Sequence, residues 1–473
     1  MTSIVHATPL ELTDCRLPQL SQSVKCGAIE RSLAQENPSS PALRIQVAVL
    51  PAKARLKKQD PLFLIAGGPG QSAIEMAAAF NQMLVRQRQR RDLVLVDLRG
   101  TGQSAPLSCA PLPASAPLST QLDPDQNLQR IKACVVQWQK TPTSDLRFYN
   151  TTRAVQDLDA VRKALGYAQI NLVGASYGTR VILEYLRLFP EHVRRVVMDG
   201  VAPASMALPL SAAEDAHTAL QHLFQACERD RACAHHYPEL RKQWRSLLRS
   251  LPVRAEVKHP VTAQPQGVLL KTDAVLGTVR TALYSPLTAS ALPQAIDQAR
   301  KGHWEPLITL GLPSARPRTP SIYIGAHMGT ICSEDMPIPE QKTDLATTDN
   351  VFVPALIRQY RELCKLFDPL PAPKGFYTLE ARQVPALLLS GEIDPVTPPR
   401  HGRSVAQSLG PAAQHLEIAN AGHGVLSLPC LGKTLSNFLD QGSPRIETPA
   451  CARSNPRPPS FLMPYGTKES AHD

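Results

Sequence analysis

The stretch "NLVGASYGTR", residues 171–180, joins an apolar run to a helical pattern through a serine that has glycines two positions before and after it. A strand followed by G-x-S-x-G and a helix is typical of a sharp turn that exposes the serine. Gly174 and Gly178 are the small residues that let the backbone turn so tightly. The Ser176 hydroxyl would lie at a helix N-terminus, whose dipole favours developing negative charge. The stretch predicts Ser176 as a nucleophile, and a plain tight turn is the alternative interpretation.

Short apolar runs on both sides of this stretch predict a sheet. Their composition is almost continuously apolar rather than alternating, which is typical of parallel strands covered by helices on both faces. The runs are residues 44–50, 62–66, 93–97, 170–173, 195–199, 386–390 and 415–419. Helical patterns at 151–167 and 177–189 alternate with them. The sequence therefore predicts an α/β fold with a mostly parallel, doubly wound sheet.

The alternation stops between about residue 205 and residue 380, where the pattern is mostly helical. The simplest organisation is a core built from residues 1–204 and 380–473, with a helical cap inserted at 205–379. After about residue 441 the chain is rich in proline, which predicts an extended tail over the surface.

The ten cysteines point to an oxidising compartment. None forms a CxxC pair or a zinc-finger spacing, and they are most easily interpreted as five local pairs in chain order. Sequence alone does not fix this connectivity, and ten reduced thiols in the cytosol are the alternative. We expect a periplasmic or secreted protein. The first fifteen residues lack the basic start and apolar core of a signal peptide. Either the sequence is a mature form, or the inference of an oxidising compartment is wrong. We expect no membrane span.

The formal net charge of +11 raises the question of an anionic partner. The densest basic segment is "VRQRQRRD", residues 85–92. No nucleic-acid-binding motif accompanies it and aromatic residues are few, so we expect no nucleic-acid partner. The segment is interpreted as the solvated end of a helix that leads into the strand at 93–97.

A serine nucleophile needs a base, and the base needs an orienting acid. Asp394 follows one predicted strand and His423 follows the next, which gives the order Ser, Asp, His of the α/β hydrolases. Glu392 and Asp199 are alternative acids. The proline-rich segment "DPVTPP" would fix the Asp394 loop, and Thr397 could donate a hydrogen bond to its carboxylate or simply cap the turn.

The segment "LIAGGPG" places a glycine turn after a strand, as an oxyanion hole requires. The backbone N–H groups of Gly68 and Tyr177 are the predicted donors, and a plain Gly-Pro turn is the alternative. The mechanism requires no cofactor and no metal. His235 and His236 are expected to be solvated, or to form a weak metal site.

Six motifs in combination resemble the tripeptidyl-aminopeptidase-like branch of the prolyl-iminopeptidase family of α/β hydrolases. They are "AGGPGQSA", "VDLRGTGQS", "NLVGASYGTR", "MDGVAP", "GEIDPVTP" and "AGHG", and the match runs from about residue 40 to the Cys451 region. The resemblance implies a helical cap, a secreted or periplasmic location, and hydrolysis of short peptides from a free N-terminus. It also implies Ser176, Asp394 and His423 as the triad, with Gly68 and Tyr177 as oxyanion donors.

In that family an acidic residue near the cap binds the substrate's amino group, and "GTICSEDMP" offers Glu334 and Asp335 at the matching place. A buried ammonium needs a carboxylate partner. The alternative is that "SED" caps a helix. Ala66 and Leu98 depart from the family, which has His and Gln there, and they leave the peptide preference open.

Two other functions compete with the aminopeptidase. A carboxylesterase would use the same triad on small esters or amides, and a free amino group on its substrate would bring no advantage. An inactive hydrolase fold that binds a ligand would ordinarily lack one member of the triad, and all three are present. The oligomeric state is not predicted.

Overall fold

The computed structural model describes residues 10–37, 39–312, 322–338, 350–366 and 369–462. Within these ranges, nine strands form one large sheet. They are β1 (Thr13–Cys15), β2 (Val24–Ser32), β3 (Ala42–Leu50), β4 (Leu62–Ile65), β5 (Leu93–Val96), β6 (Ile170–Ala175), β7 (Val193–Asp199), β10 (Ala386–Gly391) and β11 (Ala413–Ile418). All seven predicted strands are present.

The strand order is β1-β2-β3-β5-β4-β6-β7-β10-β11. The six strands from β5 to β11 in this order run parallel, and the three at the other end are antiparallel to their neighbours. The predicted fold class is thereby confirmed. The carboxyl ends of the parallel strands meet at one edge, where open α/β sheets place their sites.

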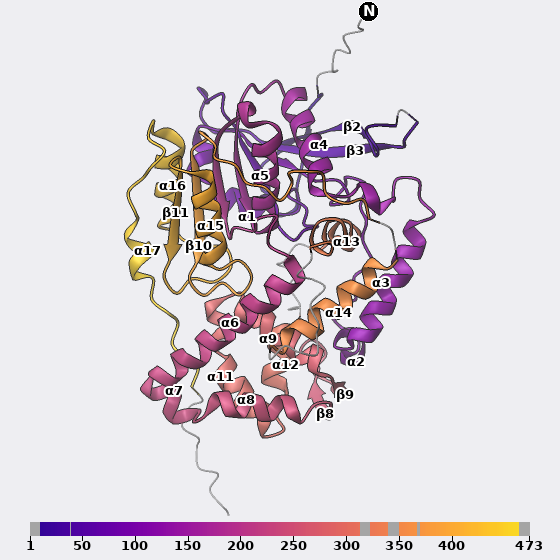
Figure 1. The fold of residues 1–473 in the computed structure, drawn as a ribbon, viewed down its shortest axis with the longest axis vertical. Coiled ribbons are helices and arrows are strands. Elements are labelled where there is room, and N and C mark those ends of the chain that lie inside the picture. Colours follow the sequence, from indigo (N-terminus) through magenta and orange to yellow (C-terminus); the bar gives the residue numbers. More distant parts are fainter. Residues whose placement is uncertain (1–9, 38, 313–321, 339–349, 367–368, 463–473) are drawn as a thin grey trace, which may run out of the picture.

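Helices cover both faces of the sheet, as the continuous apolar runs predict (Figure 1). One core lies between the sheet and the helices α4 (Thr151–Ala164), α5 (Tyr177–Leu188) and α15 (Pro399–Leu409). The other lies under α1 (Ala77–Met83) and α16 (Leu431–Asp440). In β4, Phe63 and Ile65 face the first core while Leu62 and Leu64 face the second.

A second layer of helices lies between β7 and β10 in the chain, and most of it is drawn in the lower half of Figure 1. Its described elements are α6 (Leu208–Arg229), α7 (Arg231–His236), α8 (Leu240–Arg249), β8 (Val253–Lys258), β9 (Pro265–Leu270), α9 (Thr272–Leu283), α10 (Pro286–Ala289), α11 (Leu292–Arg300), α12 (Glu305–Gly311), α13 (Ile324–Thr330), a π-helical turn (Ile331–Asp335) and α14 (Phe352–Cys364). The hairpin β8–β9 was not predicted.

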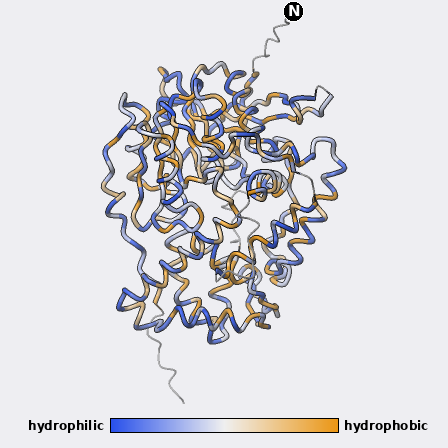
Figure 2. Tube along the Cα trace, in the orientation of Figure 1, coloured by the Kyte–Doolittle hydropathy of each residue, from blue (hydrophilic) through white to orange (hydrophobic). Residues whose placement is uncertain are grey.

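This layer has a hydrophobic core of its own, built around Phe224, Trp244 and Phe352. Along its outer helices hydrophobic and hydrophilic residues alternate, as in helices that bury one face (Figure 2). Leu118 of α2 (Leu118–Gln121) joins this core from before β6, and α3 (Pro124–Trp138) follows it. We refer to the layer from α6 to α14 as the cap.

Five disulfides form among the described residues, and they follow chain order as predicted. The pairs are Cys15–Cys26, Cys109–Cys134, Cys227–Cys233, Cys332–Cys364 and Cys430–Cys451. The last one holds α17 (Ala450–Ser454), which interrupts the tail that was predicted to be extended. Beyond α17, the Phe461 N–H donates to the Ser290 carbonyl of the cap at 2.8 Å. None of the helices in the described ranges combines the length and the apolar character that a bilayer crossing needs.

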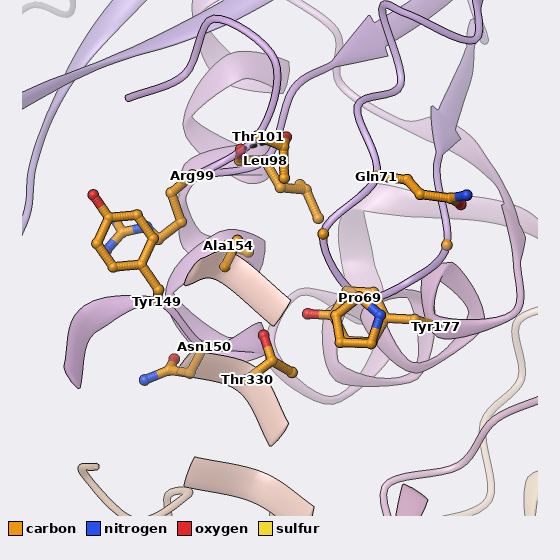
Figure 3. Close-up of a pocket in the computed structure, with 13 residues that line it drawn as sticks. Pro69, Gln71, Leu98, Arg99, Thr101, Tyr149, Asn150, Ala154, Tyr177 and Thr330 are labelled. Atoms are coloured by element: carbon orange, nitrogen blue, oxygen red, sulfur yellow. Dashed lines mark hydrogen bonds between the residues drawn. The ribbon is translucent and has the colours of Figure 1, made fainter. Parts of the chain in front are cut away.

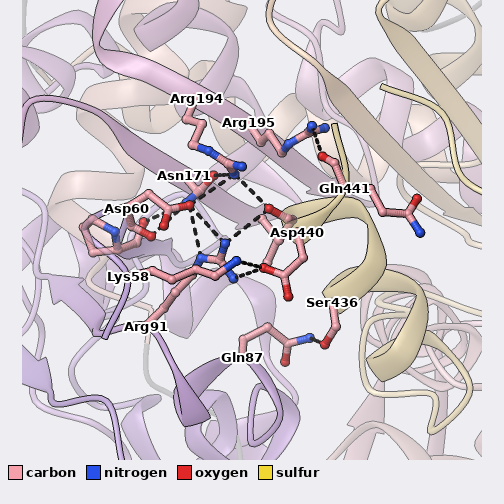
Figure 4. Close-up of polar contacts among 12 residues, drawn as sticks. Lys58, Asp60, Gln87, Arg91, Asn171, Arg194, Arg195, Ser436, Asp440 and Gln441 are labelled. Carbon is pink, nitrogen blue, oxygen red and sulfur yellow. Dashed lines mark hydrogen bonds and ion pairs between the residues drawn. The ribbon is translucent and has the colours of Figure 1, made fainter. Parts of the chain in front are cut away.

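The interpretation of residues 85–92 as a solvated helix end is wrong for its central residues. Arg88 and Arg91 are 5% and 2% exposed, and a short 3-10 turn (Gln87–Gln89) replaces the helix end. Arg91 lies between Asp60 at 3.1 Å and Asp440 at 2.8 Å (Figure 4). Asp60 and Arg91 precede β4 and β5, so their ion pair connects the amino ends of two parallel strands, at the edge opposite the carboxyl ends.

Candidate active site

The turn that carries Ser176 connects β6 directly to α5. Ser176 has φ 54° and ψ −123°, a strained conformation for a residue other than glycine. A Cβ on Gly174 would lie 2.6 Å from the Gly178 carbonyl oxygen, and a Cβ on Gly178 would lie 2.6 Å from that of Ile65. Both glycines are therefore required by close backbone approach, and the serine stands half-buried at the apex of the turn.

Asp394 and His423 lie in the loops that follow β10 and β11. Nδ1 of His423 is 2.8 Å from Oδ2 of Asp394, and the Thr397 hydroxyl donates to the same oxygen at 2.7 Å. Oδ1 of Asp394 accepts the N–H groups of Val396 and Thr397. The carboxylate thus fixes Nδ1 as the protonated nitrogen and leaves Nε2 to accept a proton. Thr397 has the role predicted for it.

The serine and the His–Asp pair lie at the same edge of the sheet. The Ser176 N–H donates to the Asp199 carbonyl at 2.8 Å, and a Cβ on the next residue, Gly200, would lie 3.3 Å from Cε1 of His423. In the described part of the chain, no hydrogen bond joins Ser176 Oγ to His423. Catalytic hydrogen bonds of this kind often tighten only when substrate is bound.

Burial and charge act in opposite directions on the histidine. Burial lowers the pKa of His423, but the charge and hydrogen bond of Asp394, with the charge of Asp199, outweigh it and raise the pKa above its ordinary value. The same attraction more than offsets burial at Asp394 and lowers the pKa of its carboxyl. The pair is therefore an ionised acid beside a histidine that binds protons readily.

The pH dependence of kcat/KM follows from this shift. The base acts only when His423 is neutral, so we expect activity to fall as pH falls through a pKa above the ordinary histidine value of about 6.5. Initial rates at low substrate concentration across pH 5 to 9 measure it. A midpoint below the ordinary value, or a flat profile, would contradict the assignment of the base.

The two alternative acids have other partners. Asp199 is 2% exposed, and its carboxylate accepts the N–H groups of Val425 at 3.0 Å and Leu426 at 2.8 Å. These residues follow His423, so Asp199 holds the base loop while its own carbonyl holds the serine turn. Glu392 is exposed and accepts the Asn420 N–H. Asp394 alone among the three is hydrogen-bonded to the imidazole within the described structure.

Asp199→Asn is expected to lower kcat/KM by about tenfold to a hundredfold, because an amide cannot accept both loop N–H groups as a carboxylate does. The acidic limb of the pH profile should also move to lower pH, since the charge that helps to raise the pKa of His423 is lost. Glu392→Gln is the matched control. If kcat/KM fell but the midpoint of the acidic limb of the pH profile did not change, the role of Asp199 would be purely structural.

Two glycines compete for the first oxyanion donor. A Cβ on Gly67 would lie 3.2 Å from Cβ of Ser176, whereas the nearest atoms to one on Gly68 belong to its own turn. Gly67 and Tyr177 line a cavity of about 20 Å³, with Asn150 and Thr330 on its other side (Figure 3). This is room for about one water molecule. The structure therefore brings Gly67, which the sequence analysis passed over, against the serine.

The glycine turn is held from two sides by side chains that the sequence analysis did not single out. Ser72 donates to Asp97 at 2.6 Å, and burial raises the pKa of Asp97 to about 6. His327 of α13 donates from Nδ1 to the Pro69 carbonyl at 2.9 Å and accepts from Tyr360 at 2.8 Å. Asp97 lies in the motif "VDLRGTGQS", so the sequence offered a signal for it. His327 lies in none of the motifs, and the sequence offered no signal for it.

The predicted substrate carboxylates form a buried cluster with Arg180 of α5. Asp335 is 3.0 Å from both Nη1 and Nη2 of Arg180 and accepts the Leu208 N–H. Glu334 accepts the N–H and hydroxyl of Thr151 and is 3.4 Å from Arg180 Nη1. Thr151 is also 2.8 Å from the Tyr177 hydroxyl. The cluster thus lies directly behind the oxyanion residue and holds two carboxylates against one guanidinium.

Arg180→Met is expected to lower the free energy of unfolding by about 3–5 kcal/mol, because it leaves two buried carboxylates without their cation. The urea midpoint measures the loss. Arg403→Met, in α15 and paired with Glu417 at an exposed position, should cost no more than about 1 kcal/mol. Equal shifts for the two variants would show that the buried cluster does not need its cation.

His235 and His236 lie at the end of α7, beside the Cys227–Cys233 disulfide and away from the other site residues. Their rings meet edge to face at 5.7 Å. Among the residues that the structure describes, no group of three or more potential ligands could hold a metal ion.

Comparison with known proteins shows the family of the chain. A profile of the α/β-hydrolase fold matches residues 60–428. The chain is 26% identical to the serine protease Hip1 of Mycobacterium tuberculosis over 438 residues, covering 85% of this chain and 83% of Hip1. It is 29% identical to the tripeptidyl aminopeptidase of Streptomyces lividans over 213 residues, 41% of this chain and 39% of that enzyme. It is 31% identical to the putative hydrolase YuaR of Escherichia coli over 38% of this chain and 35% of YuaR.

The matched profile spans well over half of the chain, and a tripeptidyl aminopeptidase stands among the relatives, as the six motifs predicted. The chain belongs to the α/β-hydrolase fold family and is a serine hydrolase of that fold.

Proposed function

We propose that the protein is a serine aminopeptidase that releases short peptides or single residues from the free N-terminus of a peptide. The observation that carries the proposal is the cluster of Arg180, Glu334 and Asp335, which has one carboxylate more than it has cations. A buried site with an excess of negative charge favours a cationic ligand. The ammonium group of a peptide N-terminus is such a ligand.

Glu334 is the carboxylate that we propose for the amino group. Asp335 is held by both Arg180 nitrogens and by a backbone N–H, so its charge is already matched. Burial raises the pKa of Glu334 to about 7, against the lowering effect of Arg180. An incoming ammonium would stabilise the ionised form. The small cavity beside Tyr177 is lined by Asn150, the neighbour of the Thr151 that holds Glu334, so the ammonium would approach the carboxylate from this side.

The proposed mechanism is acyl transfer by Ser176. His423 takes the proton from the Ser176 hydroxyl as the oxygen attacks the scissile carbonyl, and Asp394 stabilises the imidazolium. The N–H groups of Tyr177 and of Gly67, in place of or beside the predicted Gly68, would donate to the oxyanion. His423 then protonates the leaving amine, and a water molecule hydrolyses the acyl-enzyme.

The five disulfides support an extracytoplasmic compartment, since structural disulfides persist in oxidising surroundings. We therefore propose that the enzyme acts on its peptide substrates in the periplasm or outside the cell. No nucleic acid, cofactor or metal has a part in the proposal.

A pair of octapeptides that differ only in N-terminal acetylation tests the function. With the free peptide we expect short N-terminal fragments, whose length mass spectrometry reads directly, and with the acetylated peptide we expect none. Equal cleavage of both peptides would overturn the aminopeptidase and favour the carboxylesterase with the same triad.

A further inference from the structure

Arg280 of α9 is a cation that lies against the ring of a tyrosine. Its guanidinium stands over the Tyr284 ring, 5.8 Å from the centroid, and Nη1 donates to the Tyr284 hydroxyl at 3.3 Å. Its Nε is buried and has no hydrogen-bond partner. Among the described residues, no carboxylate forms an ion pair with it. A half-buried guanidinium with unused donors is suited to a planar anion.

Arg280 belongs to the cap and is connected to the catalytic base through Tyr284. It lines a cavity of about 370 Å³ between α3, α9 and α14, together with Leu128, Leu276 and Phe352. The three carboxylates that also line this cavity, Asp125, Asp273 and Glu362, are paired with Lys271, Arg358 and Lys365. The Tyr284 ring meets the His423 ring edge to face at 5.2 Å, and the Tyr284 carbonyl accepts the His423 N–H at 2.9 Å. One tyrosine ring therefore separates the guanidinium from the imidazole.

This position corresponds to the leaving-group side of the proposed reaction. His423 protonates the leaving amine, so the part of the substrate beyond the scissile bond must lie next to His423. The amino group would lie on the other side, where Glu334 is linked through Thr151 to Tyr177. The site thus presents an excess carboxylate to the acyl part and a free guanidinium to the leaving part.

We propose that Arg280 binds a carboxylate on the leaving part of the peptide. In a short peptide that carboxylate is the C-terminus, because two or three extended residues, at about 3.5 Å each, span the gap from His423 to the far side of Tyr284. A charge-assisted, bidentate contact gives both energy and direction. The enzyme would then recognise both charged ends of a short peptide. This inference rests on the proposed function.

The test compares three free-amino peptides of five residues that share the scissile bond. One ends in a carboxylic acid, the second in an amide, and the third in an amide but carries an acidic side chain on the leaving part. In the wild type we expect kcat/KM for the acid to exceed that for the plain amide by about tenfold or more. Preference for the third peptide instead would place the carboxylate on a side chain and still support the carboxylate site.

Arg280→Gln should abolish this preference, and Arg280→Lys should retain part of it. Arg358→Gln is the matched control, because Arg358 lines the same cavity but is exposed and already paired with Asp273. Turnover of a free-amino tripeptidyl coumarin, which has no carboxylate, should stay unchanged in Arg358→Gln, and Arg280→Gln should lower it far less than it lowers turnover of the peptide acid. The inference would be overturned if the wild type did not prefer the acid to the amide, or if Arg280→Gln kept that preference. In either case, unchanged turnover of the free-amino coumarin would still support the aminopeptidase. Loss of free-amine preference on the coumarin would overturn the proposed function itself.

Discussion

Replacing Ser176 by alanine is expected to lower kcat/KM for peptide and ester substrates by about 10⁴-fold or more, with little change in KM. The substitution removes only the hydroxyl group, whose oxygen would form the acyl-enzyme. The helix dipole and the oxyanion donors remain, so a small residual rate over water is expected. Steady-state kinetics on a tripeptidyl coumarin measure the effect.

The control for this variant separates loss of the nucleophile from loss of the fold. A fluorophosphonate should label the wild type and fail to label Ser176→Ala, while both give the same thermal unfolding curve. Ser205→Ala, at an exposed position in the loop after β7, should be labelled like the wild type. If Ser176→Ala were labelled, or kept full activity, Ser176 would not be the nucleophile.

Replacing Asp394 by asparagine should cost about 10⁴-fold in kcat. The amide nitrogen can donate to Nδ1 of His423, and the imidazole would then carry its proton on Nε2, where it cannot accept one from Ser176. The backbone N–H groups of Val396 and Thr397 still find an oxygen, so the loop should keep its shape. Kinetics at pH 8 measure the loss.

Glu392→Gln is the matched comparison, because Glu392 stands two residues earlier in the same loop and is exposed. We expect it to change kcat by less than about twofold, since the carboxylate is exposed and accepts the Asn420 N–H rather than a group of the proposed triad. Comparable losses in both variants would mean that the loop, rather than the Asp394 carboxylate, sets the rate.

Periodicity predicted the centre of the sheet and missed its edge. Strands such as β4 and β6 are apolar on both sides because both faces are buried, and this continuous pattern is easily recognised. β2, "VKCGAIERS", carries charges and a glycine because it lies near the antiparallel end of the sheet with one face less covered. The hairpin β8–β9 was missed for a similar reason, since its strands are only partly buried.

Charge was the least informative signal in the sequence. Arg91 and Arg180 are buried, yet nothing in their local spacing distinguishes them from surface arginines. Their partners, Asp440 and Asp335, are distant in the chain, and only the fold brings them together. Buried ion pairs of this kind are not visible to an analysis of neighbouring residues.

Candidate site residues could be predicted from the sequence where they directly follow a strand. Asp394 and His423 follow consecutive strands, so the α/β-hydrolase order was sufficient to select them, and their hydrogen bond is present. The positions of Asp199, Gly67 and His327 depend on contacts between segments that are distant in the chain. Asp199 was considered as an acid, whereas the structure shows its carboxylate on the base loop.

The most direct test is the ratio of kcat/KM for a free-amino tripeptidyl coumarin to that for its N-acetylated form, in the wild type and in Glu334→Gln. We expect a ratio of about 100 or more in the wild type and a large fall in the variant, because the carboxylate proposed for the ammonium is lost. A nitrophenyl ester should be hydrolysed equally by both proteins. A wild-type ratio near one would contradict the account and leave a general acyl hydrolase.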